Sequence, residues 1–240
     1  MILAGGLGTR LRAAVNDRPK VLALVAGRPF LTYLLDRLAH LGVEETILLV
    51  GYAADQIRGT IGSDHAGMRI TYSEETAPLG TAGAVRLALP LLRHERFLLF
   101  NGDSFCDVDL PRFTGVHGLS EGIGLVLTRV DDASRYGQVQ FEPDGRISRF
   151  EEKGGQQSAG WISAGIYLLT RQRLASIPPD QPVSLERDLL PGWVKEGHLW
   201  GFPGGRFIDI GTPESYAEAE RFFHSAAPGV DRSEIDGLPS

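Results

Sequence analysis

The sequence has a single cysteine, Cys106, which excludes an intramolecular disulfide and a metal centre built from several cysteines. No stretch approaches 18 consecutive apolar residues, and the first residues do not combine a charged segment with an apolar signal core. Acidic residues outnumber basic ones, and the formal net charge is −6. This negative charge disfavours nucleic acid and anionic membranes as partners. We therefore expect a cytoplasmic protein in which any phosphate ligand is held by a local cluster of positive charge.

Several common catalytic motifs are also absent. The 6 histidines have no zinc-binding spacing, and no serine lies in a Gly-x-Ser-x-Gly nucleophile elbow. The sequence contains neither the P-loop pattern Gly-x-x-x-x-Gly-Lys-Ser/Thr nor the Gly-x-Gly-x-x-Gly of dinucleotide-binding folds. Cys106 has no obvious activating base in the sequence, so we interpret it as a small packing residue.

What the sequence does contain is a glycine-rich turn at its start. A predicted strand over Ile2–Ala4 leads into Gly5–Gly8, where three of four residues are glycine. Glycines can bring backbone N–H groups against an anion, and Arg10 and Lys20 add mobile positive charge. An ordinary glycine turn is the simpler interpretation. The extension Gly8–Arg12, followed by a Pro-Lys pair, favours a site for a nucleoside triphosphate.

Apolar runs alternate with helical patterns in the first half of the chain. Strands are predicted over Ile2–Ala4, Thr46–Val50 and Phe97–Phe100. Helices are predicted from Pro29, in the first helical position, to Gly42, and over Thr81–Leu89. Strands apolar on both faces with helices between them indicate a doubly wound α/β fold with a mainly parallel sheet. Ligands in such sheets bind beyond the carboxyl ends of the strands, where the glycine turn is expected.

The second half has a different character and predicts a mixed or antiparallel acceptor lobe. Its strands are expected over Ile123–Val130, Gln138–Phe141, Arg146–Phe150 and Trp161–Leu169. A last helix, capped by Thr212, is expected to run to about His224. We therefore expect one domain over residues 1–225, with a nucleotide-binding half (1–115) and an acceptor half (116–225), and a flexible tail (226–240).

Two aspartates follow or occupy predicted strands. Asp103 directly follows the strand Phe97–Phe100, where an aspartate is more often a turn former. Asp209 lies in a short apolar strand, and a helix cap is the alternative role, although Thr212 already fills that position. Burying an unpaired carboxylate costs several kcal/mol, so Asp209 needs a cation or hydrogen-bond donors. With the two cations near the glycine turn, the aspartates predict an Mg²⁺-assisted phosphoryl or nucleotidyl transfer site.

Weaker motifs complete the set. Pro78–Ala84 places two glycines at the opening of a helix, where a flat base could lie or where small residues simply allow close packing. Tyr136-Gly137 and Ser163–Tyr167 are two further short motifs. In the segment 151–154, Glu151 could accept sugar hydroxyls and Lys153 could contact a phosphate, although a solvated turn is the commoner role of such residues.

Together these motifs closely resemble the sugar-1-phosphate nucleotidyltransferases, from Leu3 to about Phe223. The resemblance implies a Rossmann-like fold similar to glycosyltransferase A, with a nucleoside triphosphate and a sugar 1-phosphate as substrates. It implies a catalytic set of Arg10, Lys20, Asp103 and Asp209, of which Asp103 and Asp209 hold Mg²⁺. It implies a nucleotide site of Leu3, Ala4, Gly5, Gly6, Gly8, Thr9, Arg10, Glu74, Pro78, Gly80, Thr81 and Gly102. It implies a sugar-phosphate site of Gly137, Glu151, Lys153, Ser163 and Gly165.

Within the family, the segments 27–31, 101–105 and 207–213 look most like the D-glycero-D-manno-heptose 1-phosphate guanylyltransferases, which implies GTP and a heptose 1-phosphate. Ser163 departs from the asparagine that many relatives carry there, so its sugar contact is expected to differ. Two other substrate pairs stay open. One is GTP with mannose 1-phosphate, and the other is UTP or dTTP with a hexose or cell-wall sugar 1-phosphate. A non-catalytic binding module and a glycosyltransferase using Asp107 and Asp109 also stay open. Relatives often pair, so a homodimer is among the expected states.

Overall fold

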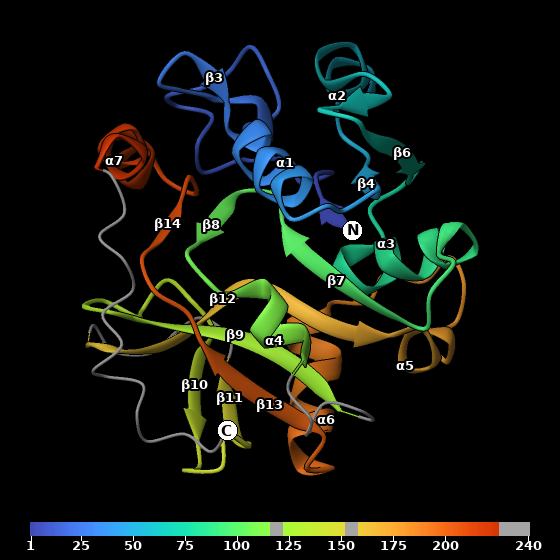
Figure 1. Ribbon diagram of the computed structural model, residues 1–240, viewed down its shortest axis with the longest axis vertical. Coiled ribbons are helices and arrows are strands. Elements are labelled where there is room, and N and C mark those ends of the chain that lie inside the picture. Colours follow the sequence, from blue (N-terminus) through green and yellow to red (C-terminus); the bar gives the residue numbers. More distant parts are fainter. Residues whose placement is uncertain (116–121, 152–157, 226–240) are drawn as a thin grey trace.

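The computed structural model describes residues 1–115, 122–151 and 158–225 (Figure 1). The predictions for Lys153 and for the tail 226–240 lie outside these residues. Within them, no helix has the length and apolar character that crossing a membrane requires.

Four parallel strands form the centre of a mixed, 10-stranded sheet, in the order β7-β1-β4-β6. They are β1 (Ile2–Leu3), β4 (Glu45–Val50), β6 (Met68–Glu74) and β7 (Arg96–Asn101). Leu3 lies opposite Leu49 of β4 and Asn101 of β7, so the carboxyl ends of these strands reach the same edge. The short β5 (Asp64–His65) pairs antiparallel with β6 beyond them. The mainly parallel α/β sheet predicted for the first half is confirmed.

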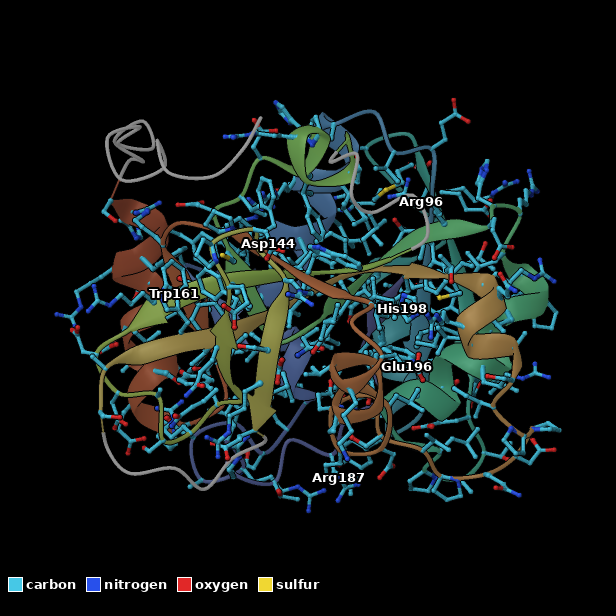
Figure 2. The ribbon with its side chains drawn as sticks, turned by 90° about the horizontal axis from the view of Figure 1, so that it is seen from below. Arg96, Asp144, Trp161, Arg187, Glu196 and His198 are labelled. Carbon is cyan, nitrogen blue, oxygen red and sulfur yellow. The ribbon has the colours of Figure 1, made fainter. Side chains whose placement is uncertain are left out.

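The second half continues the same sheet with mostly antiparallel pairing. Its strands are β9 (Ile123–Val130), β10 (Gln138–Phe141), β11 (Ile147–Glu151), β12 (Gly160–Thr170) and β13 (Leu199–Pro203). β12 pairs antiparallel with β7 and thereby joins the two halves, while β13 runs parallel to β9. Trp161 of β12, labelled in Figure 2, packs edge to face on Phe141 of β10. The mixed or antiparallel pairing predicted for the second half is therefore present, as an extension of the central sheet.

Helices cover both faces of the sheet (Figure 1). Leu48 of β4 packs in one core with α1 (Phe30–His40), α2 (Ala54–Ile61) and α4 (Leu110–Gly115). Leu49, its neighbour, faces the other core with α3 (Gly80–Ala88), α5 (Arg171–Ala175) and α6 (Leu190–Lys195). Because side chains alternate along a strand, two apolar neighbours require a cover on each side. This is the doubly wound arrangement.

A third, smaller core joins the beginning of the chain to its last helix. It contains the hairpin β2 (Leu24–Val25) and β3 (Arg28–Pro29), the strand β14 (Phe207–Asp209) paired with β8 (Ser104–Cys106), and α7 (Pro213–His224). Thr212 caps α7, as predicted, by accepting the backbone N–H of Ser215. Tyr33 of α1 stacks on Phe223 of α7 with ring centroids 3.9 Å apart. The last helix is thus fixed against the first.

Some local predictions were wrong. Pro29 is not in the first turn of α1: its ψ of 132° is extended, so it ends β3 and the helix begins at Phe30. The predicted start of α3 is one residue late, because Gly80 already belongs to the helix. Three short 3-10 or π segments were not predicted either: η1 (Lys20–Leu22), η2 (Leu89–Leu91) and the π-helix η4 (Leu185–Leu189).

Candidate active site

A cleft of about 860 Å³ opens at the carboxyl ends of the parallel strands and extends over the acceptor half. It brings together residues that were predicted from separate motifs: Leu3, Gly5, Gly6, Gly8, Thr9, Arg10, Lys20, Pro78, Gly80, Thr81, Gly102, Asp103, Gly137, Ser163, Gly165 and Asp209. The glycine turn after β1 and the loop after β7 form one wall, because these two strands are neighbours in the sheet. One cavity therefore collects both predicted subsites.

The glycine turn holds Lys20 close to it. Gly8 has a φ of +60°, in the left-handed region that favours glycine, and a Cβ there would lie 2.9 Å from Lys20 Cβ. The Lys20 side chain is consequently only 11% exposed. Arg10, in contrast, is exposed at the mouth of the cleft. The two predicted phosphate-binding cations thus line the same cavity at different depths.

Lys20 lies beside both predicted metal carboxylates. Its ammonium forms an ion pair with Asp103. A Cβ on Gly211 would contact Asp209 Oδ1 and would lie 3.5 Å from Lys20 Nζ, so these two groups flank the same point. Lys20 therefore lies close to two aspartates that are 106 positions apart in the chain.

Asp209 is buried, with 9% exposure, and carries the partners that burial requires. Arg135 Nη2 lies 3.2 Å and 3.1 Å from its two oxygens. The backbone N–H of Gly211 donates to Oδ1 at 2.6 Å, and the hydroxyl of Tyr136 donates to Oδ2. Burial raises the pKa of Tyr136, and the negative charge of Asp209 raises it further. Tyr136 is therefore a donor to this carboxylate throughout the neutral range.

The donor chemistry of the pair suits Mg²⁺. Asp103 and Asp209 supply hard carboxylate oxygens, and Mg²⁺ is usually held by one or two carboxylates together with substrate phosphates. In the described parts of the chain, no group of three or more His, Cys, Asp or Glu side chains gathers as a metal site. The residues thus fit an ion shared with the phosphates, and Mg²⁺ itself stays a prediction.

At the predicted base subsite the acidic side chain comes one residue later than expected. Glu74 does not line the cleft, because its carboxylate pairs with Arg58 of α2 at 2.7 Å, at the exposed edge of the sheet. Glu75 faces the cleft instead and accepts the backbone N–H of Leu79 at 2.9 Å. Glu75 Oε1 lies against the backbone of Gly51, and burial raises the pKa of the Glu75 carboxyl group.

On the acceptor side a chain of hydrogen bonds runs from the nucleotide half to the sugar subsite. Thr81 Oγ1 donates to Glu186 Oε2 at 2.7 Å, and the hydroxyl of Tyr167 donates to Glu186 Oε1 at 3.1 Å. Ser163 Oγ donates in turn to Tyr167 at 3.4 Å. Glu186 lies in the π-helix η4. The next residue, the exposed Arg187, is labelled in Figure 2 and also lines the cleft. Such π segments are frequent at functional sites.

Other predicted residues lie elsewhere. Ala4 is buried beneath the glycine turn, and Glu151 is exposed, pairs with Arg149 and does not line the cleft. The aspartates of the glycosyltransferase alternative do not line it either. Asp107 accepts a hydrogen bond from Arg206 Nε at 2.8 Å, and Asp109 accepts one from the backbone N–H of Arg112 at 2.9 Å.

Cys106 has the packing role assigned to it from the sequence. The side chain is fully buried, and burial raises the pKa of its thiol to about 12. A thiol with that pKa stays protonated at neutral pH and is a poor nucleophile.

The sequence reasoning missed four charged residues that line the cleft: Glu75, Arg135, Glu186 and Arg187. Each lies in a loop or short helix, where no periodicity distinguishes it from surface charge. A weak signal was present for two of them. Arg135 directly precedes the Tyr136-Gly137 motif, and Glu75 precedes the Pro-Leu-Gly-Thr segment.

Comparison with known proteins is consistent with this cleft. The nucleotidyl transferase family matches residues 1–226. A D-glycero-alpha-D-manno-heptose 1-phosphate guanylyltransferase of Campylobacter jejuni is 36% identical over 217 residues, covering 90% of this chain and 96% of that protein. A mannose-1-phosphate guanylyltransferase of Mycobacterium tuberculosis is 34% identical over 221 residues, covering 90% of this chain and 62% of that protein. The crystal structure of HddC from Yersinia pseudotuberculosis, complexed with GMP-PN, has a TM-score of 0.81 at 35% identity, covering 92% and 97% of the two chains.

Proposed function

Because the chain belongs to the nucleotidyl transferase family, we propose that it joins GTP to a sugar 1-phosphate, releasing pyrophosphate and forming a GDP-sugar. The sugar substrate we propose is D-glycero-D-manno-heptose 1-phosphate. The main support is the position of Lys20 between Asp103 and Asp209 in a cleft that also holds the glycine turn and Arg10. A cluster of this kind places positive charge and metal ligands around one triphosphate.

In the proposed reaction, an oxygen of the sugar phosphate attacks the α-phosphorus of the triphosphate in line. One P–O bond forms to the sugar phosphate, and the bond to the β-phosphate oxygen breaks, so that pyrophosphate leaves. The attacking phosphate is already an anion, so no general base is required. Arg10 and Lys20 would position the triphosphate and neutralise the charge that develops on it. Asp103 and Asp209 would hold Mg²⁺, which would neutralise negative charge on the phosphates when it is bound.

Glu75 supports guanine as the base. Guanine presents two neighbouring donors, N1–H and the N2 amino group, and a carboxylate offers only acceptors. Glu75 lies in the cleft with Oε1 against Gly51 and Gly5, between the glycine turn and Pro78. Uracil and thymine present a single N–H between two carbonyl oxygens, which a carboxylate would repel. The base preference is therefore assigned to this side chain.

The heptose assignment is supported by relatives of similar length, whereas the mannose-1-phosphate relative is longer and is matched over 62% of its length. Mannose 1-phosphate is the second candidate, because its guanylyltransferases are about as similar in sequence. Ser163, Gly137 and Gly165 would face the sugar, with Tyr167 behind them.

A substrate matrix tests the proposal. GTP, UTP, dTTP, CTP and ATP are each incubated with heptose, mannose and glucose 1-phosphates and Mg²⁺, and pyrophosphate release is measured. The expected result is turnover with GTP and the heptose 1-phosphate, and a loss of at least about 100-fold in kcat for Asp103→Ala and Asp209→Ala. Preference for another base or sugar would overturn the assigned specificity. Release of a nucleoside diphosphate instead of pyrophosphate would indicate a glycosyltransferase, and no turnover in any combination would favour a binding module.

A further inference from the structure

The guanidinium of Arg135 contacts Asp209, one of the two aspartates predicted to hold a metal ion. Arg135 lies in the segment between β9 and β10, outside the helices and strands, and lines the cleft. We propose that Arg135 exchanges partners during the reaction: it neutralises Asp209 before a metal ion is bound, and it turns to the phosphate of the sugar 1-phosphate once Asp209 ligates the ion. The identity of that second partner rests on the proposed function.

The contact between Arg135 and Asp209 is made in a way that can be released. A single nitrogen, Nη2, is shared between the two carboxylate oxygens at 3.2 Å and 3.1 Å. The stronger arrangement of arginine with a carboxylate uses two nitrogens in parallel, each with its own oxygen. Arg135 therefore neutralises Asp209 without forming the bidentate pair that would fix both side chains.

Arg135 also has donor capacity that the described residues do not use. Its Nε is buried, and among these residues it has no hydrogen-bond partner. A buried donor without a partner is unfavourable, and an anionic oxygen that reached it would remove that cost. Because the same side chain faces the cleft, we infer that the missing acceptor is supplied by a substrate.

Asp209 keeps its orientation when Arg135 leaves it. Gly211 donates a backbone N–H to Oδ1 at 2.6 Å, and Tyr136 donates its hydroxyl to Oδ2. The Gly211 donor is a backbone group that does not depend on Arg135. The Tyr136 hydroxyl lies 3.4 Å from Arg135 Nη2 and would stay a donor to Asp209 when that contact is lost. A ligand group that is held by such second contacts is ready to bind a metal without reorganising.

The direction in which Arg135 would turn follows from its position. It directly precedes Tyr136 and Gly137, and Gly137 belongs to the predicted sugar-phosphate subsite on the same wall. Arg10 and Lys20 stand on the glycine-turn side, where the triphosphate is expected. Arg135 and the exposed Arg187 are cations on the acceptor side, and Arg135 is the one next to Gly137, where the phosphate of the sugar is expected.

Metal binding in the absence of nucleotide tests the first half of the proposal. Mn²⁺ alone is the probe, because it takes the same oxygen ligands as Mg²⁺ and the free ion is counted by electron paramagnetic resonance. We expect Arg135→Met to bind Mn²⁺ about tenfold more tightly than the wild type, since a charged hydrogen bond no longer competes for Asp209. Arg112→Met is the matched control, because Arg112 is exposed on α4 and does not line the cleft. Arg135→Gln replaces the methionine variant if that variant does not fold.

Unchanged or weaker Mn²⁺ binding in Arg135→Met would overturn the proposal. So would a gain that persists in the Arg135→Met/Asp209→Asn double variant, since the extra affinity would then not involve Asp209. This readout needs no turnover, so it stands even if the substrate matrix assigns another base or sugar.

The second half is tested by steady-state kinetics with the substrates found in that matrix. Arg135→Met is expected to raise KM for the sugar 1-phosphate about tenfold, with KM for the nucleotide little changed. Arg112→Met should leave both values unchanged. An equal rise in the two KM values would indicate a general structural role and would contradict the transfer of Arg135 to the sugar phosphate.

Discussion

Lys20 and Asp103 form an ion pair inside the cleft, although 83 positions separate them in the sequence. The pair connects the short η1 helix after the glycine turn with the loop that follows β7. The Lys20 ammonium also lies on the side of Gly211 that faces Asp209, so one ammonium group is close to both carboxylates. In the proposed reaction this group would be shared between the aspartates and the phosphate oxygens.

Replacing Lys20 by methionine tests that shared role. Lys20→Met is expected to lower kcat by about 100-fold or more, because a preorganised positive group in a partly dehydrated site is lost. KM for the nucleotide should change less. Lys195→Met is the control, since Lys195 is exposed on α6 and outside the cleft. Steady-state pyrophosphate release gives kcat and KM for both variants. An unchanged kcat in Lys20→Met would remove Lys20 from the catalytic set.

Glu75 is expected to determine the base. Glu75→Gln replaces one acceptor oxygen by a donor, so the ratio of kcat/KM for GTP to that for UTP should fall at least about tenfold. The competing prediction from the sequence places the acidic contact at Glu74. If Glu74→Gln changes this ratio and Glu75→Gln does not, the assignment from the structure is wrong.

The same carboxylate predicts a pH dependence of nucleotide binding. Burial raises the pKa of Glu75, so its proton is taken up at a higher pH than that of an ordinary glutamate. The protonated form loses acceptor capacity, and KM for GTP should therefore rise as the pH falls through this raised pKa. In Glu75→Gln the rise should be absent. KM for GTP is measured between about pH 5 and pH 8 in the wild type and in Glu75→Gln. A parallel rise of KM in the two proteins would assign the pH dependence to another group.

Glu186 is expected to link the two substrate subsites. Glu186→Ala removes the acceptor for the hydroxyls of Thr81 and Tyr167, which should cost about 1 to 3 kcal/mol of unfolding free energy. KM should rise for the nucleotide and for the sugar 1-phosphate together, because Thr81 and Ser163 lie at the two ends of the chain of hydrogen bonds. Glu186→Gln, which keeps one acceptor oxygen, should lose less. Urea unfolding and two-substrate kinetics measure these effects, and a rise in one KM alone would contradict the link.

The parts of the fold with strong patterns could be predicted from the sequence. β4 and β9 are continuous apolar runs, and α7 carries a cap and a proline at its start, so their positions were predicted to within about one residue. β6 was missed because polar residues such as Arg69 and Thr71 alternate with buried ones at the edge of the parallel set. α2 was missed because it has only 8 residues, includes a glycine and begins after Ala53, which has a left-handed φ of 54°.

The residues of the site fall into the same two groups, those with a strong sequence pattern and those without one. The glycine turn, Asp103 and Asp209 belong to motifs with several residue types at fixed spacing, so sequence could assign them to one cleft. Glu75 and Arg135 are charged residues in loops. Only the folded chain shows that they face inward, whereas Glu74 and Glu151 face outward. The sequence predicted that Asp209 needs a cation or hydrogen-bond donors. It did not indicate that Arg135 and Tyr136 would be those residues.

The packing of α7 against α1 has a consequence for synthesis on the ribosome. The cleft takes Lys20 from the start of the chain and Asp209 from near its end, and β14, which carries Asp209, is held between β8 and α7. Domains emerge and begin to fold from the amino-terminal side. A nascent chain can therefore complete its parallel strands before β14 is synthesised, yet it stays incapable of the proposed turnover until β14 and α7 have left the exit tunnel.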